Sequence, residues 1–176
     1  ASTISGKWDR KKYVGNELYK KILGVVGLGK IGSHVAKVAN AMGMEVIAYD
    51  PFISAERAQQ MQVSLTSIDD LFKKADYISL HLPRTKETEN LVDQSLLGQM
   101  KPTARIVNCA RGGIIDENAL AEAIEKGVIA GAGLDVYSSE PLQSESPLRL
   151  LNENIILTPH LGASTEEAQE NVSIDV

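Results

Sequence analysis

Apolar residues along the chain follow two alternating patterns. Short runs rich in β-branched and other apolar residues predict buried strands, and they cover residues 22–26, 45–49, 77–80, 104–108, 129–134 and 154–158. Segments with helical spacing or capping residues predict helices between these runs, at residues 31–42, 54–61, 67–74, 94–100 and 117–126. We therefore predict an α/β fold, a Rossmann-type doubly wound parallel sheet ordered 3-2-1-4-5-6 with helices on both faces.

The sequence divides into one domain and two flanking segments. We expect a polar leading segment over residues 1–21, the domain itself over residues 22–163, and the start of a C-terminal helix over residues 164–176. A capping box of Ser164 and Glu167 opens that last segment. Because the chain begins with Ala and shows no signal-peptide pattern, we expect it to be a segment of a longer protein.

Composition and charge exclude several classes of protein. The 176 residues are 43% hydrophobic and 23% charged, which suits one globular domain. The net charge of −5, with no basic block beyond the short run at residues 10–12, argues against nucleic-acid binding. No apolar stretch approaches the roughly 20 residues that span a bilayer. The single Cys109 excludes an internal disulfide, so we expect a cytoplasmic protein, and we predict no metal site.

Three glycines after the first predicted strand form a G-x-G-x-x-G turn. Gly27 permits the tight turn, Gly29 lets the backbone approach a pyrophosphate, and Gly32 lets the following helix pack close to the strand. The backbone amides of Lys30 and Ile31 then face the phosphates from the helix start. On its own this motif is weak, but the strand before it and the helix after it favour dinucleotide binding.

The second predicted strand ends at Asp50, at the spacing that a dinucleotide-binding fold requires. Its carboxylate accepts hydrogen bonds from ribose hydroxyls and repels a 2′-phosphate, so we predict NAD rather than NADP as the cofactor. The alternative is an α/β domain with an ordinary glycine turn and an ordinary aspartate after a strand.

Other uncommon residues follow predicted strand ends, and they are Leu82, Pro83, Cys109, Ala110, Arg111, Asp135 and His160. In a parallel sheet these ends meet at one edge, where ligands bind. With strands about 4.8 Å apart, we expect the backbones of Arg111 and His160 to lie about 10 Å apart.

Four motifs in a fixed order resemble the D-isomer-specific 2-hydroxyacid dehydrogenases over nearly the whole chain. They are Val25-Val26-Gly27-Leu28-Gly29-Lys30-Ile31-Gly32, Asn108-Cys109-Ala110-Arg111-Gly112-Gly113, Gly133-Leu134-Asp135-Val136-Tyr137 with Glu140-Pro141, and Thr158-Pro159-His160-Leu161-Gly162-Ala163-Ser164-Thr165. The last motif, with Glu167-Ala168-Gln169, is similar to the branch of the family that oxidises 3-phospho-D-glycerate to 3-phosphooxypyruvate in the first step of L-serine biosynthesis.

The resemblance implies that Arg111, Glu140 and His160 form a catalytic trio. Oxidation of a 2-hydroxy acid needs a base that titrates near neutrality, and histidine fits that task. Glu140 would orient the ring of His160 and favour its protonated form. Arg111 would hold the substrate carboxylate or carbonyl oxygen.

The resemblance also implies further contacts to the cofactor, from Leu82, Pro83, Cys109, Ala110, Arg111, Asp135, His160, Leu161, Gly162 and Ala163. Asp135 would bind the nicotinamide carboxamide, or else it caps the next turn. We interpret Cys109 as packing against the cofactor rather than as a nucleophile. His81 is interpreted as structural and His34 as a surface residue.

The family builds a second, substrate domain from segments before and after this region, and neither is present here. We therefore expect this chain to bind NADH but to turn over poorly. Because no cluster of lysines and arginines surrounds the predicted site, 3-phosphoglycerate stays open against glyoxylate or hydroxypyruvate as substrate. A non-catalytic NAD-sensing corepressor of the same fold is the alternative from another class. The resemblance further implies a homo-oligomer, a dimer or tetramer, when intact.

Overall fold

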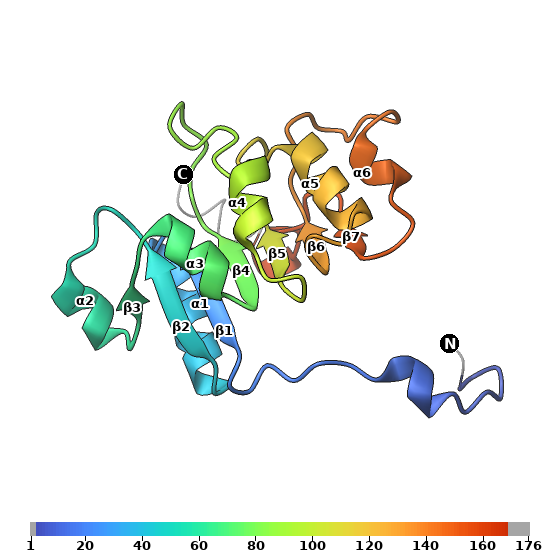
Figure 1. Cartoon of the computed structure of the whole chain (residues 1–176), viewed down its shortest axis with the longest axis horizontal. Coiled ribbons are helices and arrows are strands. Elements are labelled where there is room, and N and C mark those ends of the chain that lie inside the picture. The colour runs from blue at the N-terminus through green and yellow to red at the C-terminus, as the bar shows by residue number, and fades with distance from the viewer. Residues whose placement is uncertain (1–2, 169–176) are drawn as a thin grey trace.

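The computed structural model describes residues 3–168 and contains one parallel sheet of seven strands (Figure 1). The strands lie in the order β3-β2-β1-β4-β5-β6-β7. Their bounds are β1 Ile22–Val26, β2 Glu45–Tyr49, β3 Ser64–Leu65, β4 Tyr77–Leu80, β5 Arg105–Asn108, β6 Gly131–Leu134 and β7 Ile155–Leu157. The predicted Rossmann-type doubly wound fold is confirmed.

The strand count, however, was one short. The missed strand is β3, whose two residues, Ser64 and Leu65, are both exposed and pair with β2 at the edge of the sheet. Because β3 takes the edge position, the run at residues 77–80 is the fourth strand of the chain, β4, and not the third as counted from the sequence. This strand lies beside β1. The order 3-2-1-4-5-6 holds once β3 is counted, and β7 extends it by one strand.

The five predicted helices are present within one or two residues of their expected ends. The structure contains α1 Lys30–Ala41, α2 Ala55–Gln60, α3 Ile68–Lys74, α4 Gln94–Gln99 and α5 Glu117–Glu125, with two unpredicted elements, the 3₁₀ helix η1 Arg10–Tyr13 and the short helix α6 Pro147–Leu150. The hydroxyl of Ser67 accepts from the amide of Asp70, and the carboxylate of Asp116 accepts from two amides of the first turn of α5. These side chains satisfy amides that a helix start otherwise leaves unpaired.

The predicted capping box at Ser164 was misplaced by one residue. Helical residues begin at position 166, and the hydroxyl of Thr165 accepts from the amide of Ala168 at 3.1 Å. Thr165 is therefore the N-cap, because its side chain reaches the amide three residues ahead. The remainder of the predicted C-terminal helix lies outside the described residues.

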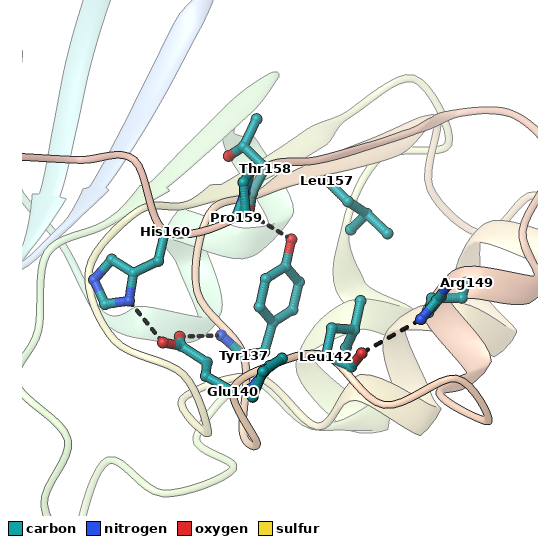
Figure 2. A pocket seen from close by; sticks show the side chains of 9 residues that line it. Tyr137, Glu140, Leu142, Arg149, Leu157, Thr158, Pro159 and His160 are labelled. Atoms are coloured by element: carbon teal, nitrogen blue, oxygen red, sulfur yellow. Dashed lines mark hydrogen bonds and ion pairs between the residues drawn. The ribbon is translucent and has the colours of Figure 1, made fainter. Parts of the chain in front are cut away.

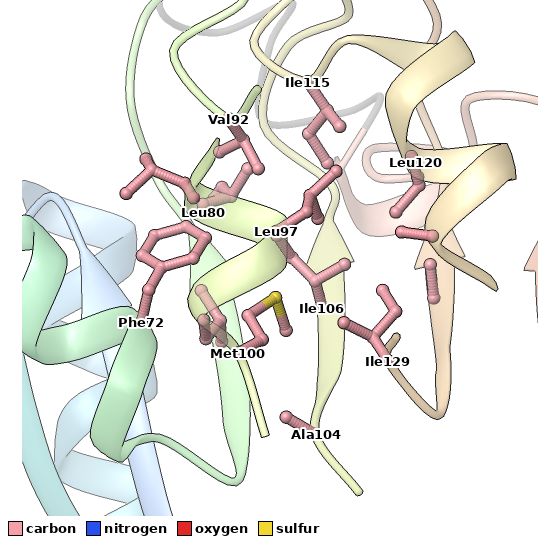
Figure 3. Close-up of a cluster of buried hydrophobic side chains, with 14 of the residues drawn as sticks. Phe72, Leu80, Val92, Leu97, Met100, Ala104, Ile106, Ile115, Leu120 and Ile129 are labelled. Carbon is pink, nitrogen blue, oxygen red and sulfur yellow. The ribbon is translucent and has the colours of Figure 1, made fainter. Parts of the chain in front are cut away.

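Helices cover both faces of the β1–β2 half of the sheet. Helix α1 packs its buried Ala36 and Ala39 against one face of this half, and α3 packs against the other. Helices α4 and α5 continue the α3 layer over the rest of the sheet (Figure 1). Figure 3 shows the larger core, in which Phe72, Leu97 and Leu120 from these three helices pack against Leu80 and Ile106 of the sheet.

The other half of the sheet is covered on one face only. Val107 of β5 and Ile156 of β7 lie in the same row of side chains, which continues the row of Val25 beneath α1. They are 38% and 70% exposed, so nothing within residues 3–168 covers this part of the row.

Residues 3–15 form an arm that extends away from the sheet (Figure 1). The arm contains η1 and exposes large apolar side chains, among them Trp8 and Tyr13. Within the described part of the chain, no helix has both the length and the apolar character needed to cross a membrane.

Candidate active site and cofactor site

The three glycines of the G-x-G-x-x-G turn occupy places that fit their expected tasks. Gly27 has a left-handed backbone, φ 96°, and a Cβ there would lie 2.7 Å from the carbonyl oxygen of His81. A Cβ on Gly32 would lie 2.0 Å from the carbonyl oxygen of Gly27, so the helix packs directly on the turn. A Cβ on Gly29 would meet nothing within 4 Å, so the space above this backbone is open. These positions form a cradle that a pyrophosphate can approach.

Helix α1 begins at Lys30 with Gly29 as its N-cap, and no side chain caps its first amides. A helix of this length with uncapped N–H groups offers a binding site for an anion. The side chain of Ile31 is exposed on the first turn. The amides of Lys30 and Ile31 are therefore available to the phosphates of a dinucleotide.

Asp50 directly follows β2 and is tied to the glycine turn. Its Oδ2 accepts from the amide of Leu28 at 2.7 Å, and its Oδ1 accepts from the amide of Phe52 at 2.9 Å. Each oxygen keeps a further lone pair for a ligand hydroxyl. A cavity of about 330 Å³ adjoins the carboxylate, lined by Leu28, Gly29, Lys30, Ser33, Asp50, Phe52, Ile53 and Arg57.

The residues after β4 lie against the glycine turn. Leu82 would touch a Cβ on Gly27, and the carbonyl oxygen of Pro83 accepts from the hydroxyl of Thr88. The Nε2 of His81 lies 2.9 Å from the Ser79 hydroxyl, and burial lowers the pKa of His81. These contacts agree with the interpretation of His81 as structural. His34 is exposed on α1, as predicted.

The loop that carries Arg111 is held by a residue that the sequence analysis missed as a site residue. The buried side chain of Asn108, the last residue of β5, donates to the carbonyl oxygen of Arg111 at 2.9 Å and accepts from the amide of Ala110 at 3.0 Å. The guanidinium of Arg111 is exposed and donates to the carbonyl oxygen of Ala110. A buried asparagine at a strand end was the available signal, since buried amides are normally hydrogen-bonded.

Cys109 lies beside Arg111 and has an exposed thiol. Burial and the negative charge of Asp135 raise the pKa of Cys109. A nucleophilic cysteine needs the opposite shift, because the thiolate is the reactive form. The raised pKa therefore argues against a nucleophilic role, and the packing of Cys109 against the cofactor stays a prediction.

Glu140 and His160 form a direct pair (Figure 2). The Nδ1 of His160 lies 2.7 Å from Oε2 of Glu140, and Oε1 of Glu140 accepts from the amide of Tyr137 at 3.0 Å. These hydrogen bonds, from His160 first and Tyr137 second, hold the pKa of Glu140 below its ordinary value. His160 has a left-handed backbone, φ 56°, which is uncommon outside glycine and clusters at functional sites.

Asp135, the residue after β6, holds the segment that follows His160. Its buried carboxylate accepts from the amides of Leu161 and Gly162 at 2.8 and 2.9 Å and from the hydroxyl of Thr158. Burial raises the pKa of Asp135, but these hydrogen bonds and the charge of His160 outweigh it, so the pKa lies below its ordinary value. In the structure Asp135 thus caps the next turn, the plainer of the two roles expected for it. Ala163 is exposed beyond this turn.

A cavity of about 640 Å³ opens beside the Glu140–His160 pair (Figure 2). Its lining residues are Tyr137, Glu140, Pro141, Leu142, Arg149, Leu157, Thr158, Pro159 and His160. The structure thus joins two of the three predicted catalytic residues by a hydrogen bond. Arg111 follows β5, on the same edge of the sheet, but its described hydrogen bond goes to its neighbour Ala110.

This combination of a parallel sheet, a glycine turn and an aspartate after β2 defines a dinucleotide-binding domain. Residues 1–162 match the model of the D-isomer specific 2-hydroxyacid dehydrogenase, NAD binding domain. The chain therefore belongs to this family, and NAD is its cofactor.

Individual relatives narrow the comparison further. The chain is 63% identical over 175 residues to a D-3-phosphoglycerate dehydrogenase from Synechocystis sp., a match that covers 99% of this chain and 31% of that protein. The chain thus spans about a third of the length of this relative.

Two crystal structures show the same fold. A glyoxylate reductase from Paecilomyes thermophila superposes with a TM-score of 0.86 at 35% identity, covering 98% of this chain and 52% of that one. The NAD-complexed D-isomer specific 2-hydroxyacid dehydrogenase from Lactobacillus delbrueckii ssp. bulgaricus gives 0.81 at 36% identity, covering 96% and 54%.

Proposed function

We propose that this chain is the NAD-binding domain of an enzyme that oxidises 3-phospho-D-glycerate to 3-phosphooxypyruvate, the first step of L-serine biosynthesis. The observation that carries the proposal is the 2.7 Å contact between Nδ1 of His160 and Oε2 of Glu140 beside an open cavity. The relative from Synechocystis sp. supplies the choice of substrate.

Proton transfer is the task of His160. Oxidation of the substrate removes a hydride from C2 and a proton from the C2 hydroxyl, and NAD, when bound, supplies the hydride acceptor. Because Glu140 occupies Nδ1, the ring presents Nε2 to the substrate, and Nε2 accepts the hydroxyl proton. Glu140 fixes the tautomer and orientation of the ring and stabilises the imidazolium that forms.

Arg111 binds the substrate carboxylate. Its guanidinium is exposed at the end of β5, and the planar group can donate two parallel hydrogen bonds to a carboxylate. Asn108 holds the Arg111 loop through two hydrogen bonds, so the guanidinium starts from a fixed backbone.

The cofactor contacts follow the strand ends of the sheet. The glycine cradle and the amides of Lys30 and Ile31 receive the pyrophosphate, and Asp50 receives the ribose hydroxyls of the adenosine. The remaining contacts come from Leu82, Pro83, Cys109, Ala110, Arg111, Asp135, His160, Leu161, Gly162 and Ala163.

The phosphate of the substrate needs cations from elsewhere. In the part of the chain that the structure describes, Arg149 is the one lysine or arginine that lines the large cavity, and it donates to the carbonyl oxygen of Leu142. We therefore assign phosphate recognition to a second domain, with residues 22–163 as the cofactor domain and residues 1–21 and 164–176 as its connections. The exposed apolar side chains of the arm support a homo-oligomer, and the single cysteine supports a cytoplasmic location.

His160→Asn in the intact enzyme tests the catalytic assignment. Asparagine tolerates the left-handed backbone but cannot accept the proton, so we expect kcat to fall by a factor of about 10² to 10⁴. NADH affinity, measured by fluorescence titration, should change little. Full retention of turnover would refute the role of His160 as the base. A wild type that binds NADH but has no turnover would instead favour the alternative, a non-catalytic NAD-sensing corepressor.

A substrate panel separates the two enzyme classes. We expect kcat/KM of the wild-type enzyme to favour oxidation of 3-phosphoglycerate over reduction of glyoxylate by at least tenfold, that is about 1.4 kcal/mol. A preference for glyoxylate would instead indicate that the intact enzyme acts as a glyoxylate reductase.

A further inference from the structure

Tyr137 lies three residues after β6 and is almost completely buried, with 7% of its surface exposed. It takes part in three contacts through three different groups. Its backbone amide donates to Oε1 of Glu140 at 3.0 Å, and its hydroxyl donates to the carbonyl oxygen of Thr158 at 2.8 Å. Its carbonyl oxygen lies so close to Gly112 that a Cβ on Gly112 would be 1.6 Å away.

Each of these contacts reaches a segment that carries one of the three proposed catalytic residues. Gly112 directly follows Arg111 in the chain. Glu140 is contacted itself, and Figure 2 shows the Tyr137 ring standing between Glu140 and the end of β7. The Thr158 carbonyl oxygen that accepts from the Tyr137 hydroxyl also accepts from the amide of His160 at 3.1 Å.

The hydroxyl is a dependable donor at neutral pH. Burial and the negative charge of Asp135 raise the pKa of Tyr137, so it keeps its proton. The hydroxyl also lies 3.2 Å from the carbonyl oxygen of Leu134, which places it between the ends of β6 and β7. The ring therefore holds the end of β7 at a fixed distance from the loop that carries Glu140.

We propose that Tyr137 is a positioning residue that holds Arg111, Glu140 and His160 in one arrangement. The proposal rests on the proposed function, because it concerns the same site. Without the hydroxyl, the Thr158 carbonyl keeps only the hydrogen bond from the tight turn at His160, whose left-handed backbone depends on its surroundings. The ring of His160 then samples positions away from Glu140, and proton transfer slows because it depends on orientation.

Tyr137→Phe in the intact enzyme is the test, since it keeps the ring and both backbone contacts. We expect kcat to fall about tenfold or more, while KM for the hydroxy acid and Kd for NADH stay within about twofold. Tyr77→Phe is the matched control, because Tyr77 is half-buried at the start of β4, the opposite end of the strands. An unchanged kcat in Tyr137→Phe, or an equal loss of NADH binding and kcat, would overturn the proposal.

A spectroscopic measurement separates this proposal from the proposed function. The 176-residue chain has three histidines, so an NMR spectrum of this chain with ¹⁵N-labelled histidine contains few signals. The variant Glu140→Gln identifies the Nδ1 signal of His160, because that signal depends on the hydrogen bond to Glu140. We expect Tyr137→Phe to shift that signal toward its position in Glu140→Gln, and Tyr77→Phe to leave it in place.

The two measurements distinguish failure of the proposed function from failure of the positioning role. If the wild type oxidises no 2-hydroxy acid but Tyr137→Phe shifts the His160 signal, the proposed function fails and the positioning role stands. If the wild type is active and Tyr137→Phe changes neither kcat nor the signal, the positioning role fails alone.

Discussion

Side chains that bind backbone groups determine where the proposed catalytic residues lie. Asn108 holds the loop of Arg111, Tyr137 holds Glu140 and the end of β7, and Asp135 holds the turn after His160. The contacts of Asp135 and of the Tyr137 hydroxyl join residues 21 to 27 positions apart, so they depend on the folded sheet and could not be predicted from the sequence. The contacts of Asn108 are local, and an asparagine at a strand end was the signal for them. Glu140 and His160, in contrast, were predicted from motifs, and the structure places them together.

Asp135→Asn tests the strength of one such contact through its pH dependence. The pKa of Asp135 in the folded chain lies below its ordinary value of 3.8, so its contribution to stability is present above that value and is lost as the pH falls through the lower, folded pKa. Asparagine places an NH₂ group toward backbone amides, and we expect a loss of about 1–3 kcal/mol at pH 7.

Urea unfolding of both proteins at pH 7, 5 and about 3 measures the difference. The difference in free energy of unfolding between the wild type and Asp135→Asn should be the same at pH 7 and at pH 5, and it should become smaller at the lowest pH. A gap that stays constant at every pH would show that the charge of Asp135 contributes nothing.

Strands and helices with strong periodicity were predicted well, and elements without it were missed. Both residues of β3 are exposed, so no alternation marked them, and α6 has only four residues. Capping side chains located two of the five predicted helix starts, since Ser67 and Asp116 accept from the first-turn amides as expected. The helix start that we predicted at Ser164 lies one residue later, at Thr165. Both residue types can cap a helix, and only the folded backbone decides between them.

The same substitution, isoleucine to alanine, should reduce the free energy of unfolding by different amounts in β5 and in β7. Ile106 of β5 is fully buried in the larger core, whereas Ile156 of β7 lies on the uncovered face. We expect Ile106→Ala to reduce the free energy of unfolding by about 2–5 kcal/mol, because it leaves a cavity. Ile156→Ala should change it by less than about 0.5 kcal/mol. Denaturant unfolding of the chain measures both, and similar losses would contradict the observed covering of the sheet.

At the scale of the whole molecule, the proposed cofactor residues gather at one edge of the sheet, and the proposed substrate site is bounded on one side only. The sheet has a core on both faces around β1, where the glycine turn lies. The large cavity beside His160 is open in the described residues, and the arm at residues 3–15 extends away from it. We therefore expect binding of the cofactor and turnover of the substrate to be separable in this chain.

Calorimetry of the 176-residue chain tests this separation. We expect NADH to bind and NADPH to bind at least tenfold more weakly, because a 2′-phosphate would approach the carboxylate of Asp50. Turnover of 3-phosphoglycerate should be at least a hundredfold below that of the intact enzyme. Absence of NADH binding would contradict the first expectation, and turnover near that of the intact enzyme would contradict the second.

The left-handed backbone at His160 also limits which residues evolution can place there. Asparagine and glycine adopt this conformation at low cost, whereas a β-branched residue such as valine adopts it rarely. A descendant that abandoned catalysis but kept the fold would therefore be expected to replace this histidine with asparagine or glycine. A histidine retained among such relatives marks selection on the imidazole itself, because the backbone alone would accept either substitute.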